Sequence, residues 1–174
     1  MKVFVIGGSG SGKSEWAEKK AIELSKGKSA IYVATMRPEG DEERKRIRRH
    51  REARSRRNFI TLELDCELKP LISYREKTDT VLVEDLSNLL SNLRYFRNMS
   101  FESALEKIKS EMELVERAFK NIVLVSNDIF SDGVDYPKET REYIENLARL
   151  NISFAAWADS FAEIVVGINV AKEL

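Results

Sequence analysis

Gly7-Gly8-Ser9-Gly10-Ser11-Gly12-Lys13-Ser14 is the stretch that decides the fold. It follows the short apolar run 3–6, which is typical of a buried strand, and it leads into a segment with helical spacing that ends at residue 25. The glycines let successive backbone N–H groups turn toward phosphate oxygens, and the helix adds the partial positive charge of its N-terminus. The stretch therefore predicts a phosphate-binding loop between a strand and a helix, the alternative being a Gly/Ser-rich turn that matches by chance.

Two side chains of this loop have expected roles in binding a nucleoside triphosphate. Lys13 would reach the β- and γ-phosphates, and Ser14 would place its hydroxyl on Mg²⁺. Such a loop also needs acidic residues, and α/β sheets bind ligands at the carboxyl ends of their strands. Glu84 and Asp85 end one apolar strand and Asp128 follows another, so these are the candidates, with Glu84 the first choice. Each is alternatively a helix cap or a turn carboxylate.

Short apolar runs alternate with helical segments along the rest of the chain. The expected strands are 30–34, 59–64 (an outer strand), 80–83, 121–125 and 161–168, and the expected helices are 86–96, 101–119 and 138–157. This alternation is typical of a mostly parallel sheet with helices on both faces. We therefore expect an α/β fold of the P-loop NTPase (RecA-like) class, with residues 1–174 forming a single nucleotide-binding domain.

The composition limits the classes of partner. Lys and Arg together number 29, as do Asp and Glu, so the formal net charge is zero and no global field attracts nucleic acid or an anionic membrane. A single cysteine, Cys66, excludes an intrachain disulfide, and no apolar stretch is long enough to span a bilayer. Because the chain starts directly with a strand-like run and shows no signal-peptide pattern, we expect a cytoplasmic protein that does not bind membranes.

One local segment is strongly basic, with Lys or Arg at nine of the fourteen positions from Arg44 to Arg57. It is either a solvated helix face paired with nearby glutamates or a nucleic-acid patch, although no interleaved aromatic residues are present for base stacking. The segment also holds His50, the only histidine, between Arg49 and Arg51. An imidazole there would be able to attack a phosphorus centre and carry a nucleotidyl group, with the arginines binding the displaced phosphates.

These motifs, in this order, resemble the bifunctional adenosylcobinamide kinase/adenosylcobinamide-phosphate guanylyltransferase family of cobalamin biosynthesis. The resemblance is collinear over nearly the whole chain, and its motif around His50 is more specific than the phosphate loop. The matching residues are Gly7–Ser14 with Ala17-Glu18, Tyr32-Val33-Ala34-Thr35, Arg46-Ile47-Arg48-Arg49-His50-Arg51, Thr61-Leu62-Glu63, Glu84 with Asn92, Val125-Ser126-Asn127-Asp128 and Ala158-Asp159.

The resemblance implies two linked reactions. In the first, ATP or GTP bound at the phosphate loop with Mg²⁺ phosphorylates the aminopropanol hydroxyl of adenosylcobinamide. In the second, His50 attacks the α-phosphate of GTP, releases pyrophosphate and passes GMP to the new phosphate, which gives adenosylcobinamide-GDP. The resemblance thus implies a corrinoid substrate, Lys13 and His50 as catalytic residues, and a homo-oligomer, which is a trimer in that family.

The resemblance also implies a set of binding residues around the nucleotide. The implied Mg²⁺ ligands are Ser14 and Glu84. The implied nucleotide-binding residues are Gly7, Gly8, Ser9, Gly10, Ser11, Gly12, Lys13, Ser14, Ala34, Thr35, Met36, Arg51, Glu52, Ala53, Arg54, Glu63 and Glu84.

The chain departs from the family pattern after Asn127. The family usually continues Glu-Val-Gly-x-Gly-Ile-Val-Pro, whereas this chain has Asp128-Ile129-Phe130-Ser131-Asp132-Gly133-Val134, and further differences follow up to residue 152. Two other functions therefore stay open. One is a P-loop kinase of another small molecule, in which His50 only binds phosphate. The other, with weaker support, is a nucleotide-binding regulatory or nucleic-acid-associated protein.

Overall fold

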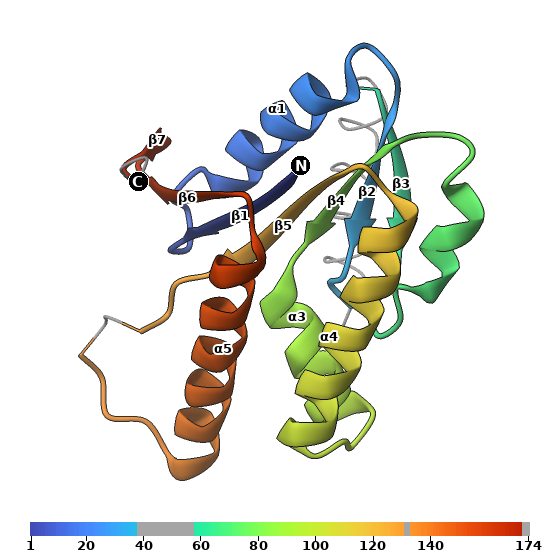
Figure 1. Ribbon diagram of the computed structural model, residues 1–174. Helices are drawn as coiled ribbons and strands as arrows, with labels where there is room; N and C mark the ends of the chain where they lie inside the picture. The colour runs from blue at the N-terminus through green and yellow to red at the C-terminus, as the bar shows by residue number, and fades with distance from the viewer. Residues whose placement is uncertain (38–57, 131–132, 172–174) are drawn as a thin grey trace.

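A central β-sheet organises the computed structural model, which describes residues 1–37, 58–130 and 133–171. Within these residues the sheet has seven strands in the order β3-β2-β4-β5-β1-β6-β7. Neighbouring strands from β3 to β6 are all parallel, and only the short β7 is antiparallel to its neighbour. The expected mostly parallel α/β sheet is therefore confirmed (Figure 1).

Most expected bounds differ from the observed ones by no more than two residues. The strands are β1 (Lys2–Gly7), β2 (Ala30–Ala34), β3 (Phe59–Glu63), β4 (Thr80–Glu84), β5 (Asn121–Asn127), β6 (Ser160–Val165) and β7 (Ile168–Asn169). The helices are α1 (Lys13–Ser25), α3 (Leu86–Ser91), α4 (Phe101–Ala118) and α5 (Lys138–Trp157), with a 3₁₀ helix η1 (Lys69–Tyr74) and a π-helical segment η2 (Asn92–Phe96). The helix expected at 86–96 is thus α3 continued by η2.

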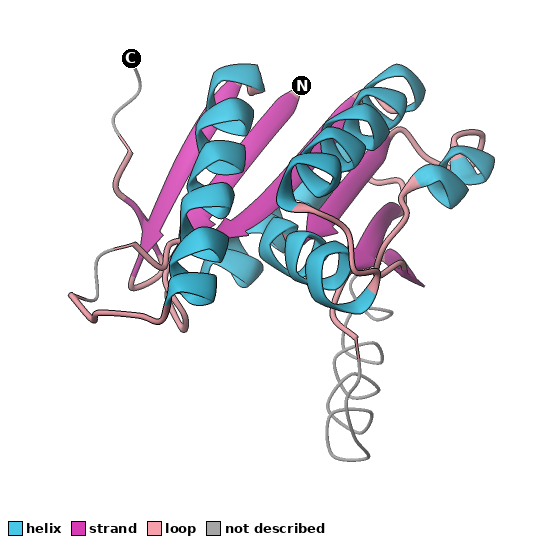
Figure 2. Cartoon of the chain, turned by 90° about the horizontal axis from the view of Figure 1, so that it is seen from below, coloured by secondary structure: helices cyan, strands magenta, loops and turns pink. Residues whose placement is uncertain are grey.

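Alternate residues of a strand face opposite sides of the sheet, and both sides are covered. Val3 and Val5 of β1 belong to the same buried cluster as Ala17 of α1. Phe4, which lies between them, packs on the other side, where its ring centroid is 6.5 Å from that of Phe154 in α5. Helices α3, α4 and α5 lie on this second side (Figures 1 and 2), and most of their large apolar residues are buried there. Coverage of both faces explains why the strands are nearly continuous apolar runs.

The strand register brings the carboxyl ends of the strands to one edge of the sheet. Gly7, at the end of β1, is paired with Asn127 at the end of β5. Ala34, at the end of β2, is paired with Glu63 of β3 on one side and with Glu84 of β4 on the other. This is the edge at which parallel sheets bind ligands.

The expected last strand, 161–168, is instead a hairpin. β6 ends at Val165, and β7 returns antiparallel with Ile168 opposite Val165. Val166 and Gly167 form the turn with φ angles of 50° and 79°. Positive φ at both central residues is the type I′ geometry, whose twist matches the flanking strands, and glycine adopts it without steric cost. The turn was missed because Gly167 is its only marker in an otherwise apolar run.

None of the helices within residues 1–37, 58–130 and 133–171 is long and apolar enough to cross a membrane.

Candidate nucleotide-binding site

The predicted phosphate loop starts at the end of β1 and runs into the first turn of α1. Gly12 has a φ of 87°, and its carbonyl accepts a hydrogen bond of 3.1 Å from the Trp16 N–H, which begins the helix. A Cβ added to Gly7 would come within 2.6 Å of the backbone oxygen of Ile164, so a side chain there would displace backbone. The backbone therefore has the curled path before a helix N-terminus that suits phosphate binding.

The β6–β7 hairpin lies against this loop. The Gly167 N–H donates a 2.7 Å hydrogen bond to the Ser11 carbonyl. A Cβ added to Gly12 would lie 3.1 Å from the Gly167 Cα, so the two backbones are in close contact. The hairpin turn thus supports the phosphate loop, a role that a single strand over 161–168 would not have.

Lys13 is the first residue of α1, and its side chain folds back over the loop. The residue is 8% exposed, and its ammonium donates a 3.1 Å hydrogen bond to the Gly8 carbonyl. Burying an ammonium is costly unless it is paired, and this bond is one of the three that the group is able to donate. The position suits a cation that completes its bonding with a bound phosphate.

Glu84, at the end of β4, connects the loop to the sheet. Its Oε1 accepts a hydrogen bond from the Ser14 hydroxyl, and its Oε2 accepts one of 2.8 Å from the Tyr32 hydroxyl. Burial raises the pKa of Glu84 above its usual value, and the two hydrogen bonds oppose that shift because they stabilise the charged carboxylate. Tyr32 was not among the predicted site residues, because a tyrosine inside an apolar strand carries no sign of where its hydroxyl points.

The pair of Ser14 and Glu84 fits Mg²⁺. Mg²⁺ prefers oxygen ligands and is usually bound by one or two carboxylates together with substrate phosphates. The hydroxyl and the carboxylate supply such oxygens in direct contact with one another. In the described part of the chain no three His, Cys, Asp or Glu side chains form a group that could hold a metal. Nucleotide phosphates and water would complete the coordination of a bound Mg²⁺.

Asp85 has the structural role that was the alternative for each acidic candidate. It is the N-cap of α3, where its Oδ1 accepts hydrogen bonds from the Asn88 N–H at 2.8 Å and the Ser87 hydroxyl at 2.5 Å. Its Oδ2 accepts a third, at 3.0 Å, from the Asn127 amide. These three donors occupy the carboxylate, as expected for a capping residue.

Asp128 lies beside the phosphate loop. Its N–H donates a 3.1 Å hydrogen bond to the Gly7 carbonyl, which ties the residue after β5 to the start of the loop. Its half-buried carboxylate accepts a 3.2 Å hydrogen bond from the Phe130 N–H. This is a turn contact, and it leaves the second carboxylate oxygen, Oδ2, without a described donor.

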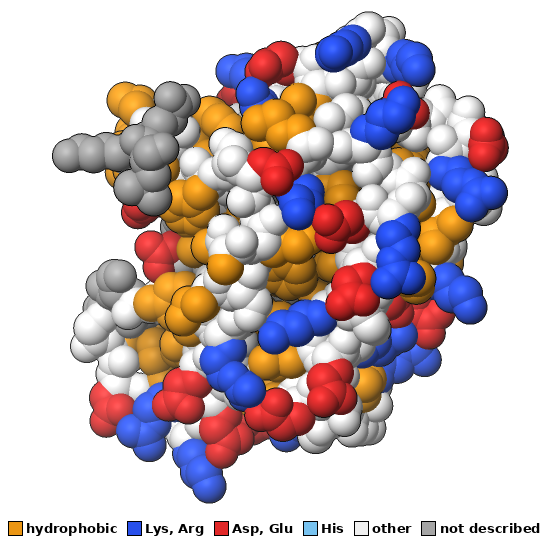
Figure 3. Space-filling model, viewed as in Figure 1, with side chains coloured by type: hydrophobic (Ala, Val, Ile, Leu, Met, Phe, Trp, Pro, Cys, Tyr) orange, Lys and Arg blue, Asp and Glu red, His pale blue; other side chains and the backbone are white. Residues whose placement is uncertain are grey.

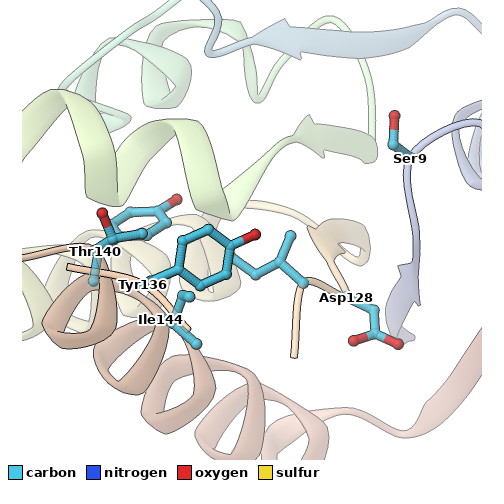
Figure 4. A pocket seen from close by; sticks show the side chains of 7 residues that line it. Ser9, Asp128, Tyr136, Thr140 and Ile144 are labelled. Carbon is cyan, nitrogen blue, oxygen red and sulfur yellow. The ribbon is translucent and has the colours of Figure 1, made fainter. Parts of the chain in front are cut away.

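A pocket of about 510 Å³ opens between Asp128 and α5. Figure 4 shows Ser9 of the phosphate loop and Asp128 on one side, with Tyr136, Thr140 and Ile144 on the other. The lining residues are Ser9, Asp128, Ile129, Tyr136, Thr140, Tyr143 and Ile144. Burial raises the pKa of Tyr143 far above its usual value, and its hydroxyl donates a 2.9 Å hydrogen bond to the Ser87 carbonyl, so it stays a neutral phenol.

The predicted residues after β2 differ in their environment. Thr35 is fully buried, and its hydroxyl accepts a 2.6 Å hydrogen bond from the Asp85 N–H. The Asn92 amide donates to the carbonyls of Thr35 at 2.9 Å and Asp65 at 2.8 Å. Thr35 and Asn92 therefore hold together the chain segments that follow the strands at the site edge. Met36 is 42% exposed.

The remaining predicted residues have varied surroundings. Ala34 is half-buried and Glu63 is exposed at the same edge of the sheet, where they are accessible to a ligand. The predicted catalytic His50 and the predicted binding residues Arg51, Glu52, Ala53 and Arg54 lie outside the described residues.

Two sequence comparisons match this chain to known proteins over almost its full length. The sequence model of the family described as "Cobinamide kinase / cobinamide phosphate guanyltransferase" matches residues 3–172. The "Bifunctional adenosylcobalamin biosynthesis protein CobP" of Pseudomonas aeruginosa is 28% identical over 170 residues, which cover 97% of this chain and 95% of that protein. The crystal structure of the flagellar accessory protein FlaH from Methanocaldococcus jannaschii has a TM-score of 0.48 and 14% identity, covering 93% of this chain and 70% of FlaH. That last likeness is too small to bear on function.

Proposed function

The chain belongs to the cobinamide kinase / cobinamide phosphate guanyltransferase family, and we propose that it phosphorylates adenosylcobinamide and then transfers GMP from GTP to the product. Membership of this family identifies it as a kinase and a nucleotidyltransferase. The observation that carries the proposal is the contact between the Ser14 hydroxyl and the Glu84 carboxylate, next to the loop that holds Lys13. Phosphoryl transfer needs this combination of a cation, oxygen ligands for a metal and a phosphate cradle.

In the proposed kinase step, the loop binds ATP or GTP through its backbone N–H groups and the N-terminus of α1. The Lys13 ammonium stabilises negative charge on the γ-phosphoryl group during transfer. Mg²⁺ bound at Ser14 and Glu84 would supply further charge neutralisation at the phosphates. The acceptor hydroxyl oxygen bonds to the γ-phosphorus while the bond from that phosphorus to the bridging oxygen breaks, which releases the nucleoside diphosphate.

In the proposed second step, His50 carries the GMP. Its imidazole nitrogen bonds to the α-phosphorus of GTP, and pyrophosphate leaves with the electrons of the broken bond. A phosphate oxygen of adenosylcobinamide phosphate then attacks the same phosphorus and frees the imidazole. The support for this step is the sequence around His50 together with family membership.

Two labelled nucleotides test the proposal. The terminal label of γ-labelled ATP or GTP should move to adenosylcobinamide, and α-labelled GTP should then yield labelled adenosylcobinamide-GDP. Phosphorylation of another small molecule, with no transfer to the corrinoid, would favour the divergent kinase. Salt-dependent binding to random oligonucleotides without turnover would favour a nucleic-acid-associated protein. On the face in Figure 3, Lys and Arg are interspersed with Asp and Glu, so this face has no continuous basic patch.

Glu84→Gln should raise the Mg²⁺ concentration needed for half-maximal kinase activity by about tenfold or more, since even the outer partners of metal ligands are worth that much in affinity. Glutamine keeps the size of the side chain but removes its charge. The measurement is a Mg²⁺ titration of the kinase rate at saturating nucleotide. The matched control is Glu113→Gln on α4, a largely exposed glutamate. A Mg²⁺ dependence equal to that of the parent would make Glu84 a structural residue.

We further propose that the chain works in the cytoplasm as a homo-oligomer, a trimer by resemblance to its family. Most large apolar residues of α4 and α5 are buried in the core, with Ile152 of α5, at 71% exposed, as an exception. Several exposed apolar side chains gather on the C-terminal hairpin and next to it, namely Phe161, Val165, Val166, Ile168 and Val170.

Sedimentation at micromolar concentration should give a species of about three times 20.0 kDa, the mass of one chain. Replacement of Val166, which is 85% exposed, by Lys should shift the equilibrium toward monomer, because it places a charge in the proposed interface. Monomer alone at that concentration in the unaltered protein would contradict the proposal.

A further inference from the structure

We propose that the pocket beside the phosphate loop binds the hydroxyl-bearing arm of the acceptor, and that Asp128 is the catalytic residue that takes the proton from this hydroxyl. The inference rests on the proposed kinase step. It adds to that step the place of the acceptor and the identity of the base.

The pocket lies where an acceptor would have to be. One of its lining residues, Ser9, belongs to the phosphate loop itself. Asp128 is held to the start of the same loop by the bond from its N–H to the Gly7 carbonyl. A γ-phosphate cradled by the loop would therefore border the pocket, and an acceptor in the pocket would face it.

The lining has the character of a site for a neutral alcohol. Four of the seven lining residues are Ile129, Ile144 and the tyrosines at 136 and 143, so most of the wall is apolar or aromatic. Asp128 is the one charged side chain among the seven. A carboxylate disfavours an anionic acceptor, since like charges repel, and it favours a hydroxyl that donates to it.

The size of the pocket limits which part of the acceptor enters. A volume of about 510 Å³ lies in the range that holds a small molecule. A corrin macrocycle with its amide side chains is larger than the ligands that such pockets enclose. The geometry therefore points to entry of the aminopropanol arm, with the ring outside the pocket.

The two other acidic candidates at the strand ends, Asp85 and Glu84, accept hydrogen bonds from groups of the protein. Asp85 accepts three hydrogen bonds as the cap of α3, and both oxygens of Glu84 accept bonds from hydroxyls. Asp128, by contrast, accepts one hydrogen bond from the described residues, from the Phe130 N–H to Oδ1. Its Oδ2 is thus the carboxylate oxygen left to accept a proton from a substrate.

The chemical step balances with the groups already named. The acceptor oxygen forms a bond to the γ-phosphorus, and its proton moves to the Asp128 carboxylate. The bond between the γ-phosphorus and the bridging oxygen breaks, and its electron pair leaves with the nucleoside diphosphate. Asp128 plays the part of the carboxylate base that orients and deprotonates a substrate hydroxyl in other phosphoryl transfers.

Asp128→Asn is the first test. It keeps an oxygen for the Phe130 N–H but is unable to take a proton. The expected result is a fall in kcat for phosphorylation of adenosylcobinamide by about 10²–10⁴-fold, with unchanged affinity for the nucleotide measured by calorimetry. The matched control is Asp135→Asn, an aspartate in the same connection that is 92% exposed and outside the pocket lining. The control should keep the parent kcat.

Ile144→Trp is the second test, because it fills the pocket from α5 and leaves the residues of the phosphate loop unchanged. It should raise KM for adenosylcobinamide by about tenfold or more, the cost expected for lost contact in a well-fitted pocket, and leave nucleotide affinity unchanged. Thermal unfolding of each variant shows whether it is folded. If Asp128→Asn is unfolded, Ile144→Trp and Asp128→Glu take its place. Asp128→Glu retains the carboxylate and should retain part of kcat.

The outcomes separate the inference from the proposed function. If the parent protein does not phosphorylate adenosylcobinamide at all, the proposed function fails and the inference fails with it. If the parent is active and Asp128→Asn matches it in kcat, Asp128 is not the base and only the inference is overturned. An unchanged acceptor KM in folded Ile144→Trp overturns the location of the acceptor.

Discussion

Lys13→Ala should lower nucleoside triphosphate turnover by about 10²–10³-fold, the loss seen when one preorganised donor to developing negative charge is removed. The side chain is buried over the phosphate loop, and its ammonium is hydrogen-bonded to the Gly8 carbonyl. It therefore needs little reorganisation to meet a phosphate. Both proposed steps depend on phosphate charge, but the kinase step is the one in which Lys13 contacts the transferring group, so its rate should fall the most.

The measurement is the kinase rate with saturating acceptor, together with nucleotide affinity measured by calorimetry. A matched control is Lys19→Ala in the same helix, where the lysine side chain is 74% exposed and pairs with Glu15 at 2.9 Å. An exposed pair of this kind contributes little, so this variant should behave like the parent. If folded Lys13→Ala has the nucleotide affinity and turnover of the parent protein, Lys13 has no role in nucleotide binding or catalysis.

The sheet was predictable from the sequence because its strands are buried on both faces and stand out as short apolar runs. The run 30–34 and the helix 138–157 have the expected bounds. The order of strands in the sheet has no local signal, since it depends on which runs pair in three dimensions. The prediction of one strand over 161–168 was wrong for a related reason. The turn at Val166 and Gly167 interrupts an apolar pattern, and no polar residue marks it.

The site was predictable where residues able to bind a metal or phosphate lie in the phosphate loop or at the carboxyl end of a strand. Ser14 and Glu84 were expected to share a metal, and they are in contact although 70 positions separate them along the chain. Asp85 and Asp128 look equivalent in sequence, because each follows an apolar run. Only the structure distinguishes them. Asp85 accepts three hydrogen bonds as the N-cap of α3, whereas Asp128 borders a pocket. Tyr32 reaches Glu84 from a neighbouring strand, a contact set by sheet pairing rather than by spacing.

A pocket is harder to predict than a motif because its walls come from separate parts of the fold. Ser9 belongs to the loop after β1, while Thr140 and Ile144 come from the first turns of α5. None of these residues is unusual for its local segment. The region after Asn127 also departs from the family pattern. In the proposed arrangement, specificity for the acceptor depends on this packing as well as on the phosphate loop.

His50→Asn should abolish covalent labelling by α-labelled GTP while leaving the kinase step largely active. His50 is the only histidine in the chain, so no second imidazole is able to replace it. Attack on phosphorus requires the neutral imidazole, and positive charge on the adjacent arginines at 49 and 51 would favour that form by like-charge repulsion. The same guanidiniums would stabilise the pyrophosphate that leaves. The proposed kinase step does not use His50, because it assigns that chemistry to Lys13 and the metal ligands.

The stability of the label identifies the bond. A phosphoramidate breaks in mild acid and survives alkali, which separates it from a phosphoserine ester, so the labelled parent protein should lose GMP in acid and keep it in base. Mapping of the labelled peptide should place GMP on the segment that contains His50, and Lys13→Ala serves as the reciprocal control, with its kinase step impaired. If the parent protein takes no label from GTP while still phosphorylating adenosylcobinamide, the transfer half of the proposal is wrong. The nine basic residues from Arg44 to Arg57 would then act as a phosphate clamp for the kinase step.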